Sequence, residues 1–189
     1  MTSCFKGKFK VTSPRGYRTL GTKKEYHSGL DLVALEDKTV YAIADGIVDA
    51  VPFEKNGFGY YVRQILPDGS RLYYGHLAKG SIVVKKGQAV KTGDKLGIMG
   101  STGNSTGPHT HLELRPKGTS KDSLDICEFT GIPNKKGTYE ANQKTKHEIA
   151  YECACRIEDV CSLSKDTINY LWKYKYAEDL FIKIAEKLK

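Results

Sequence analysis

Residues 100–113 read Gly100-Ser101-Thr102-Gly103-Asn104-Ser105-Thr106-Gly107-Pro108-His109-Thr110-His111-Leu112-Glu113. The glycines and hydroxyl residues of the first half predict a turn-rich loop that can pass close to a ligand. The second half predicts a β-strand, in which side chains alternate between two faces. His109, His111 and Glu113 then share one face, so two imidazoles project into the same space.

A second group of ligand-type side chains lies upstream, in the segment His27-Ser28-Gly29-Leu30-Asp31. On a straight strand His27 and Asp31 would lie about 13 Å apart, too far to share an ion that each touches at about 2.0–2.2 Å. We therefore expect the chain to bend at Gly29, because glycine adopts backbone conformations closed to other residues.

The chain has five histidines, and a lone histidine in a strand is more often a hydrogen-bonded structural residue than a ligand. His76 ends an aromatic run, Tyr73-Tyr74-Gly75-His76-Leu77, whereas His147 stands between two charged residues and is expected to be a solvated surface residue. One acid, two ligand-type imidazoles and two spare imidazoles in one β-rich region give about the ligand count of an open zinc site.

Glycine and proline show where the chain changes character, since 18 of the 19 glycines and all 6 prolines lie within residues 1–133. There, β-branched and aromatic runs alternate with turns and predict strands at 39–44, 60–66, 71–76, 81–85 and 110–115. We expect a mainly β domain over residues 1–133, a linker over 134–142 and a small α-helical C-terminal module over 143–189.

The expected helical module shows apolar residues at helical spacing on two stripes. Ser164, followed by Asp166 in the first turn, predicts a helix N-cap. The stripes consist of Ile149, Cys153, Ile157 and Val160, and then of Ala177, Leu180, Phe181, Ile184 and Leu188.

Composition excludes several classes of protein. No apolar run approaches the roughly 18 residues that a membrane helix needs, so we expect no membrane insertion. The first residues carry charge without the apolar core of a secretory signal, which predicts synthesis in the cytoplasm without a signal peptide. The five cysteines are scattered and odd in number, so reduced thiols are expected.

Several segments follow one another in an order typical of a known enzyme family: His27-x-Gly29-x-Asp31, residues 41–48, 57–62 and 74–77, Gly93-Asp94, and residues 100–113. Together they resemble the lysostaphin-type (LytM-like, β-lytic) zinc endopeptidases of peptidoglycan over roughly residues 13–115. The resemblance implies an antiparallel β-sheet groove with one zinc ion per chain on its floor. It implies that His27, Asp31 and His111 are the zinc ligands and that His76 and His109 are non-ligand catalytic residues. The reaction that it implies is hydrolysis of amide bonds in stem or cross-bridge peptides by zinc-activated water.

The residue types agree with that chemistry. Three ligands leave a fourth position for water, and the sequence has no His-Glu-x-x-His helix to supply a carboxylate base, so an imidazole has to take the proton of the water. Glu113 fits either an acceptor for a ligand imidazole or an exposed carboxylate at a strand end. Tyr17, Arg18 and Tyr26 are three candidates for positioning the substrate.

Other functions are weighed against this one. The same fold can serve as a non-catalytic peptidoglycan-binding or scaffold module. Residues 87–97 resemble the hairpin of swinging-arm carriers but lack the Met-Lys-Met or Asp-Lys-Ala sequence that offers a modifiable lysine. Residues 157–168 have some features of a helix-turn-helix. Residues 1–133 carry 19 basic and 13 acidic side chains, against 11 and nine afterwards. The positive charge therefore lies mainly on the β part, which favours anionic wall polymers over nucleic acid as partners.

The absence of an export signal suits a phage or prophage endolysin. Such an enzyme acts on the cell wall after release, or as part of a virion. The helical module would then serve wall targeting, oligomerisation or domain support.

Overall fold

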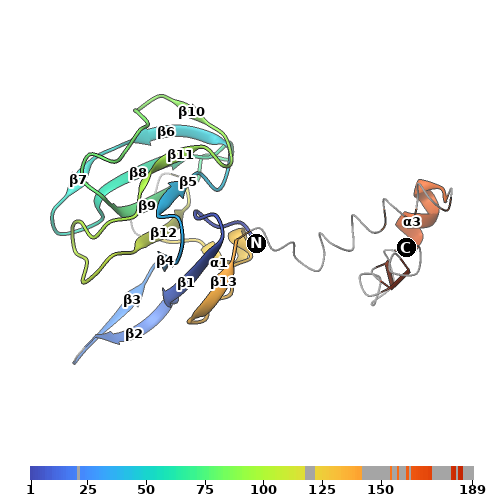
Figure 1. The fold of residues 1–189 in the computed structure, drawn as a ribbon, viewed down its shortest axis with the longest axis horizontal. Helices are drawn as coiled ribbons and strands as arrows, with labels where there is room; N and C mark the ends of the chain where they lie inside the picture. Colours follow the sequence, from blue (N-terminus) through green and yellow to red (C-terminus); the bar gives the residue numbers. More distant parts are fainter. Residues whose placement is uncertain are drawn as a thin grey trace. The chain divides into compact units, whose positions relative to one another are not determined.

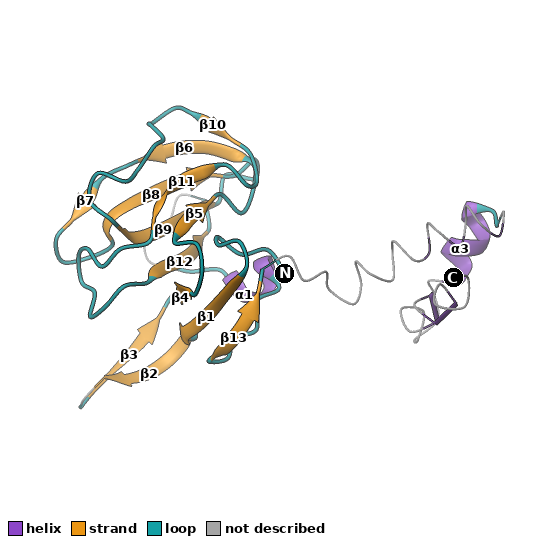
Figure 2. Cartoon of the chain, in the orientation of Figure 1, coloured by secondary structure: helices purple, strands orange, loops and turns teal. Residues whose placement is uncertain are grey.

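The computed structural model describes residues 1–20, 22–117 and 122–141, and beyond them residues 154, 157, 161, 163–171, 180, 181, 183 and 184. The chain forms two compact units, Met1–Asn142 and Gln143–Lys189 (Figure 1). Strands dominate the first unit (Figure 2), in agreement with the mainly β prediction.

One large antiparallel sheet makes up most of the first unit. Its strands are β1 (Lys8–Ser13), β4 (Leu30–Ala34), β6 (Gly46–Ala50), β7 (Phe53–Glu54), β8 (Gly59–Ile65), β9 (Arg71–Leu77), β10 (Ala89–Val90), β12 (Thr110–Arg115) and β13 (Gly137–Glu140). They follow the order β10-β6-β8-β9-β12-β4-β1-β13, with β7 paired to β8. Two smaller antiparallel pairs join β2 (Gly16–Leu20) to β3 (Lys23–His27), and β5 (Thr39–Tyr41) to β11 (Lys95–Ile98).

The large sheet has an apolar face and a polar face at its centre. Leu30 and Leu32 on β4, with Leu112 and Leu114 on β12, are buried in the main hydrophobic cluster. Side chains alternate along a strand, so Asp31, His111 and Glu113 point the other way. The antiparallel register sets His111 directly opposite Asp31, which brings two of the predicted ligands together on the polar face.

The strands predicted at 60–66, 71–76 and 110–115 are present as β8, β9 and β12, and the strand predicted at 39–44 is shortened to β5. The strand predicted at 81–85 is wrong. The side chains do alternate between exposed and buried, as at Val83 and Val84, but the backbone of this segment forms no ladder of hydrogen bonds with a neighbouring strand. Ser81 donates its backbone N–H and its hydroxyl to the Ala78 carbonyl, which makes a turn.

The boundary of the first unit also differs from the prediction. The interval 134–142, expected to be a linker, contains β13, which pairs with β1 along Lys8 to Val11. Tyr139 packs on the buried Phe9 with ring centroids 6.1 Å apart.

A short helix that was not predicted, α1 (Ile126–Thr130), precedes β13 along the chain. The Asp125 carboxylate caps this helix by accepting hydrogen bonds from the Cys127 and Glu128 amides.

In the second unit, α3 (Lys165–Leu171) begins after Ser164. The Thr167 amide donates to the Ser164 hydroxyl at 3.2 Å, so the predicted N-cap is confirmed. Among the described residues, Ala154, Ile157, Ile168 and Phe181 form a buried cluster that Leu163, Leu171 and Ile184 cover.

Other sequence-based expectations for this unit fare differently. Leu180, expected on the apolar stripe, lies exposed. Ile149, Cys153, Val160, Ala177, Leu188 and His147 lie outside the described residues. Among the helices in the described part of the chain, none has the length and apolar character that crossing a bilayer requires.

Truncation of the core below the site tests this arrangement. We expect Leu112→Ala to lower the free energy of unfolding by about 2–5 kcal/mol, because it leaves a cavity between β4 and β9. The control Leu35→Ala removes the same atoms from an exposed position and should change it by no more than about 0.5 kcal/mol. Urea unfolding followed by circular dichroism measures both. Equal effects of the two substitutions would contradict the core assignment.

Candidate metal centre

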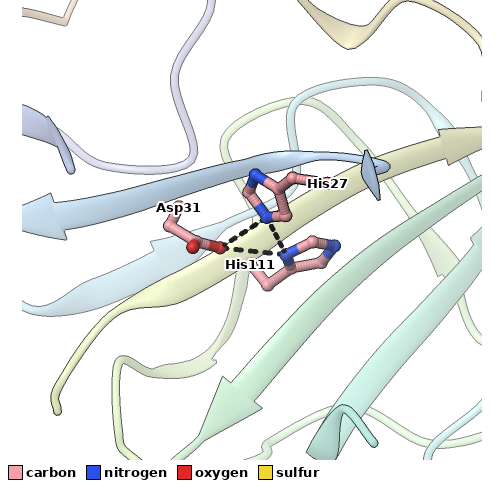
Figure 3. Close-up of side chains that lie close together, drawn as sticks. All are labelled: His27, Asp31 and His111. Atoms are coloured by element: carbon pink, nitrogen blue, oxygen red, sulfur yellow. Dashed lines mark hydrogen bonds and ion pairs between the residues drawn. The ribbon is translucent and has the colours of Figure 1, made fainter. Parts of the chain in front are cut away.

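Three predicted ligands meet where β3, β4 and β12 come together (Figure 3). His27 Nε2 lies 3.1 Å from Asp31 Oδ1 and 3.1 Å from His111 Nδ1, and His111 Nδ1 lies 2.9 Å from Asp31 Oδ1. All three side chains are buried. The chain bends between His27, the last residue of β3, and Leu30, the first of β4, as predicted.

Gly29 allows this bend mainly because of a close approach. A Cβ at this position would lie 2.8 Å from His111 Nε2 and closer still to the Leu112 carbonyl oxygen. Any side chain would therefore push the bend away from β12. The requirement is steric, whereas the sequence analysis expected a conformational one.

The hydrogen bonds of the two ligand histidines settle which nitrogen faces the centre. His27 donates its Nδ1–H to the Pro14 carbonyl at 2.8 Å, and His111 donates its Nε2–H to Glu113 at 3.0 Å. The other nitrogens, His27 Nε2 and His111 Nδ1, then direct lone pairs toward the Asp31 carboxylate. Two imidazole nitrogens and a carboxylate oxygen that converge on one point suit a shared cation.

Two imidazole nitrogens and one carboxylate oxygen form a donor set that suits zinc and leaves a position open for water. The electrostatics agree with a cation at this point. Burial disfavours charge on His111, but hydrogen bonds with Asp31 and Glu113 outweigh it and raise the pKa of His111 to about 9. Burial likewise opposes the Asp31 carboxylate, yet His111 and His27 hold its pKa well below the usual range. The three residues therefore fit a zinc ion.

Glu113 supports the ligand His111. Its carboxylate is only 1% exposed and accepts from His111, from the Ser28 hydroxyl at 2.8 Å and from Arg115 Nε at 2.6 Å. Burial by itself would raise the pKa of Glu113, but the hydrogen bonds from His111 and Arg115 prevail and lower it to about 2. Of the two interpretations of Glu113, the contact with a ligand imidazole is confirmed and the exposed carboxylate is wrong.

The three ligands lie in a pocket of about 320 Å³ that His76 and His109 also line. His109 Nε2 lies 3.6 Å from Asp31 Oδ1, and the rings of His76 and His109 are 4.6 Å apart between centroids. His109 donates its Nδ1–H to the Gly107 carbonyl at 2.8 Å. The structure thus brings the four histidines of the first unit together around one pocket.

His76 has an unusual backbone. Its φ of 60° is the only positive value recorded for a non-glycine residue in the described part of the chain. The Phe58 carbonyl accepts its backbone N–H and the Thr102 carbonyl accepts its Nδ1–H, both at 2.7 Å. Burial lowers the pKa of His76 to about 4. The imidazole is therefore neutral at pH 7, with its Nε2 lone pair available.

Thr102 fixes the loop that holds His76. Its hydroxyl donates to the Leu77 carbonyl at 2.7 Å and accepts from the Tyr60 amide at 3.0 Å. The loop lies so close to β8 that a Cβ on Gly59, at φ +64°, would overlap the Thr102 carbonyl group. The glycine-rich loop of the sequence analysis thus holds a histidine in place through its backbone.

Of the three candidate substrate-positioning residues, Arg18 alone lines the pocket. Its guanidinium donates to Glu25 at 2.8 Å and to the Ser13 hydroxyl at 2.7 Å, and lies 3.3 Å from Asp31 Oδ2. Tyr17 and Tyr26 stack edge to face beside it, with Tyr17 88% exposed, and neither lines the pocket.

Arg115 and Phe58 are among the pocket residues that the sequence analysis missed. Arg115 continues the alternation of His109, His111 and Glu113 by one more step, so the strand period could have identified it. Phe58 enters the pocket from the loop before β8, and no local pattern predicts that placement.

Comparison of the chain with known proteins shows the family that shares this site. Residues 25–123 match the family model described as Peptidase family M23. The chain is 32% identical over 143 residues to the peptidoglycan DD-endopeptidase ShyC of Vibrio cholerae. The matched region covers 72% of this chain and 31% of ShyC. The chain spans about a fifth to a third of the length of the curated relatives it matches.

Two solved structures share the fold. The catalytic domain of lysostaphin from Staphylococcus simulans superposes with a TM-score of 0.56 at 30% identity, covering 65% of this chain and 91% of that domain. The catalytic domain of the prophage-encoded M23 protein EnpA from Enterococcus faecalis gives a TM-score of 0.54 at 34% identity, covering 61% of this chain and 87% of that domain. The family match covers more than half of the chain and includes all three ligands, so the chain belongs to peptidase family M23.

Proposed function

We propose that this chain is a zinc-dependent endopeptidase that hydrolyses amide bonds in the stem or cross-bridge peptides of peptidoglycan. One observation carries the proposal: the ligand atoms of His27, Asp31 and His111 converge in a pocket that two further imidazoles line. The names of the relatives ShyC and lysostaphin, a peptidoglycan endopeptidase and an antimicrobial peptidase, support this substrate class.

His27, Asp31 and His111 would hold one zinc ion per chain. Such an ion polarises a peptide carbonyl and lowers the pKa of a water molecule toward about 7. Glu113 keeps the Nε2–H of His111 occupied, which directs Nδ1 to the ion. The Pro14 carbonyl does the same for His27.

His76 and His109 would move the proton during hydrolysis. Each donates its Nδ1–H to a backbone carbonyl, so in the neutral ring the second nitrogen, Nε2, is the one that can accept a proton. We propose that one of the pair accepts the proton of the attacking water and that the pair delivers it to the nitrogen of the leaving amine. The amide C–N bond then breaks to give a carboxylate and an amine. Arg18, fixed by Glu25 and Ser13, would position the substrate carbonyl.

The non-catalytic scaffold alternative is less favoured, because the described pocket retains three ligands and two further imidazoles. We also propose a phage or prophage origin, supported by the similarity to the prophage-encoded EnpA. Cytoplasmic synthesis followed by action on the wall, after release or from a virion, belongs to that proposal. So does an affinity of the cationic first unit for anionic wall polymers, while nucleic acid is not proposed as a partner.

The ligand set makes a prediction about zinc affinity. Glu113→Gln should weaken zinc binding by about 10–100-fold, because the amide orients His111 less firmly than the carboxylate does. His111→Ala and Asp31→Ala should abolish stoichiometric binding. Competition with a chromogenic chelator measures the affinity, and Glu25→Gln, a change in a pocket carboxylate that binds Arg18 and not a ligand histidine, is the control. Unchanged affinity in Glu113→Gln would contradict the role assigned to Glu113.

The two further histidines make a prediction about rate. His76→Ala and His109→Ala should keep one zinc per chain but lower kcat about a hundred- to ten-thousand-fold. New amino groups released from purified peptidoglycan measure the reaction, which a chelator should stop and added zinc restore. New reducing ends without new amines would show a glycosidase and overturn the proposal.

For the second unit, we propose an α-helical module that targets the enzyme to the wall. A chain ending at Asn142 keeps β13 and the whole main core, so it should stay folded and cleave soluble peptides. Its binding to intact walls in a sedimentation assay should fall at least several-fold. Unchanged wall binding would show that the second unit has another role, such as oligomerisation or domain support.

A further inference from the structure

The polar face of the large sheet continues past the metal centre as a row of arginines. On β12, Arg115 lies on the same face as His111 and Glu113. In the antiparallel register Arg71 on β9 stands directly opposite Arg115, and Arg63 on β8 stands opposite Tyr73. These three arginines belong to neighbouring strands and share one surface.

The Arg71–Arg115 pair departs from the usual chemistry of sheets. Like charges directly opposite each other on neighbouring strands destabilise the pair. Arg115 Nε donates a hydrogen bond to Glu113 at 2.6 Å, and Arg63 Nε donates one to Asp49 at 2.5 Å. Three guanidinium groups thus face two carboxylates, which leaves one positive charge in excess.

Arg71 is the arginine with the weakest compensation. Its Nε lies 4.0 Å from the Asp49 oxygen that Arg63 already engages. That buried Nε has no hydrogen-bond partner in the described part of the chain. The Arg71 side chain is nevertheless 27% exposed, so a ligand can reach it.

Arg115 connects this row to the pocket. Its guanidinium lies 4.6 Å from the Tyr73 ring centroid and 5.4 Å from that of Phe58, and it lines the pocket that holds the metal ligands. The aromatic rings fix its position. A substrate that occupies the pocket and follows β12 passes over Arg115 before it reaches Arg71.

The spacing along β12 sets the reach of such a substrate. His111 and Arg115 are four residues apart, or about 13 Å along the strand. An extended peptide covers that distance in about four residues. A guanidinium whose ion pair with Asp49 is as long as 4.0 Å suits a second carboxylate, which it can bind through two parallel hydrogen bonds.

We propose that Arg71 forms a carboxylate-binding subsite that selects peptides carrying a free carboxylate about four residues from the cleaved bond. The inference rests on the proposed endopeptidase function and adds a determinant of substrate choice. A phosphate of an anionic wall polymer would use the same chemistry. We assign the peptide carboxylate because Arg71 shares its face with the metal centre.

The test uses pairs of synthetic stem peptides, identical except that the acidic residue four positions from the cleaved bond carries a carboxylate or a carboxamide. Pairs modified on either side of the bond are measured. For the full-length chain, kcat/KM should be about tenfold higher for one carboxylate peptide than for its amide. Arg71→Gln should bring that ratio close to one through KM, and Arg71→Lys should give an intermediate value.

Lys86→Gln, which removes an exposed positive charge from a turn outside the pocket lining, should keep the wild-type ratio. A wild-type ratio of one, or an equal loss for both peptides in Arg71→Gln, would overturn the subsite. Binding of sn-glycerol 3-phosphate that depends on Arg71, with no discrimination between the peptides, would assign the site to phosphate instead.

The subsite and the endopeptidase function can fail separately. Titration calorimetry of the slow His76→Ala variant measures the same ratio as a ratio of Kd, because little peptide is cleaved during the titration. Cleavage of purified peptidoglycan with a peptide ratio of one overturns the subsite alone. Carboxylate-selective binding that depends on Arg71, without release of amines, overturns the endopeptidase function alone.

Discussion

The antiparallel pairing of β4 with β12, in the register that sets Asp31 opposite His111, is the constraint on which the site depends. A slip by one residue would set Asp31 opposite Thr110 or Leu112, so that Asp31 and His111 would point to opposite faces of the sheet. Burial of Leu30, Leu32, Leu112 and Leu114 on the opposite face opposes that slip. Core packing therefore holds the metal ligands in register, and Gly29 lets β3 deliver the third ligand against the same two strands.

A second layer of control lies in the placement of protons. Each histidine of the first unit has one nitrogen committed to an acceptor, which is a backbone carbonyl for His27, His76 and His109 and the Glu113 carboxylate for His111. Those carbonyls belong to the loops before β2 and before β12. The loops thus select which nitrogen faces the pocket. This explains why a glycine-rich segment without reactive side chains lies beside the metal centre.

Much of this site follows from periodicity and spacing. Strand alternation places His111 and Glu113 together, and the His27–Asp31 interval demands a bend. Other features depend on contacts distant in sequence. Strands β1 and β3 each carry two lysines, and β2 and β13 are short and carry exposed side chains. Their local composition therefore does not predict strands, and pairing with neighbours creates them. The segment 81–85 shows the converse, since it has the side-chain pattern of a strand, and its Val83 amide donates to the Leu96 carbonyl of β11, but no ladder forms. The choice of Arg18 over Tyr17 and Tyr26 depends on which face of the β2–β3 hairpin meets the pocket.

The two faces of the central sheet follow different rules. On the core face the usual rule holds that apolar side chains are buried, and its leucines and Tyr74 are all buried. The polar face gathers the exceptions: three converging lone pairs, a histidine at positive φ and two arginines opposite each other. Each exception costs stability, and the strained backbone of His76 alone costs of order 1–3 kcal/mol. The opposite face of the same strands supplies apolar burial that offsets these costs. Because the exceptions lie on strands whose other side is locked in the core, they persist in the folded state, where a ligand can relieve them.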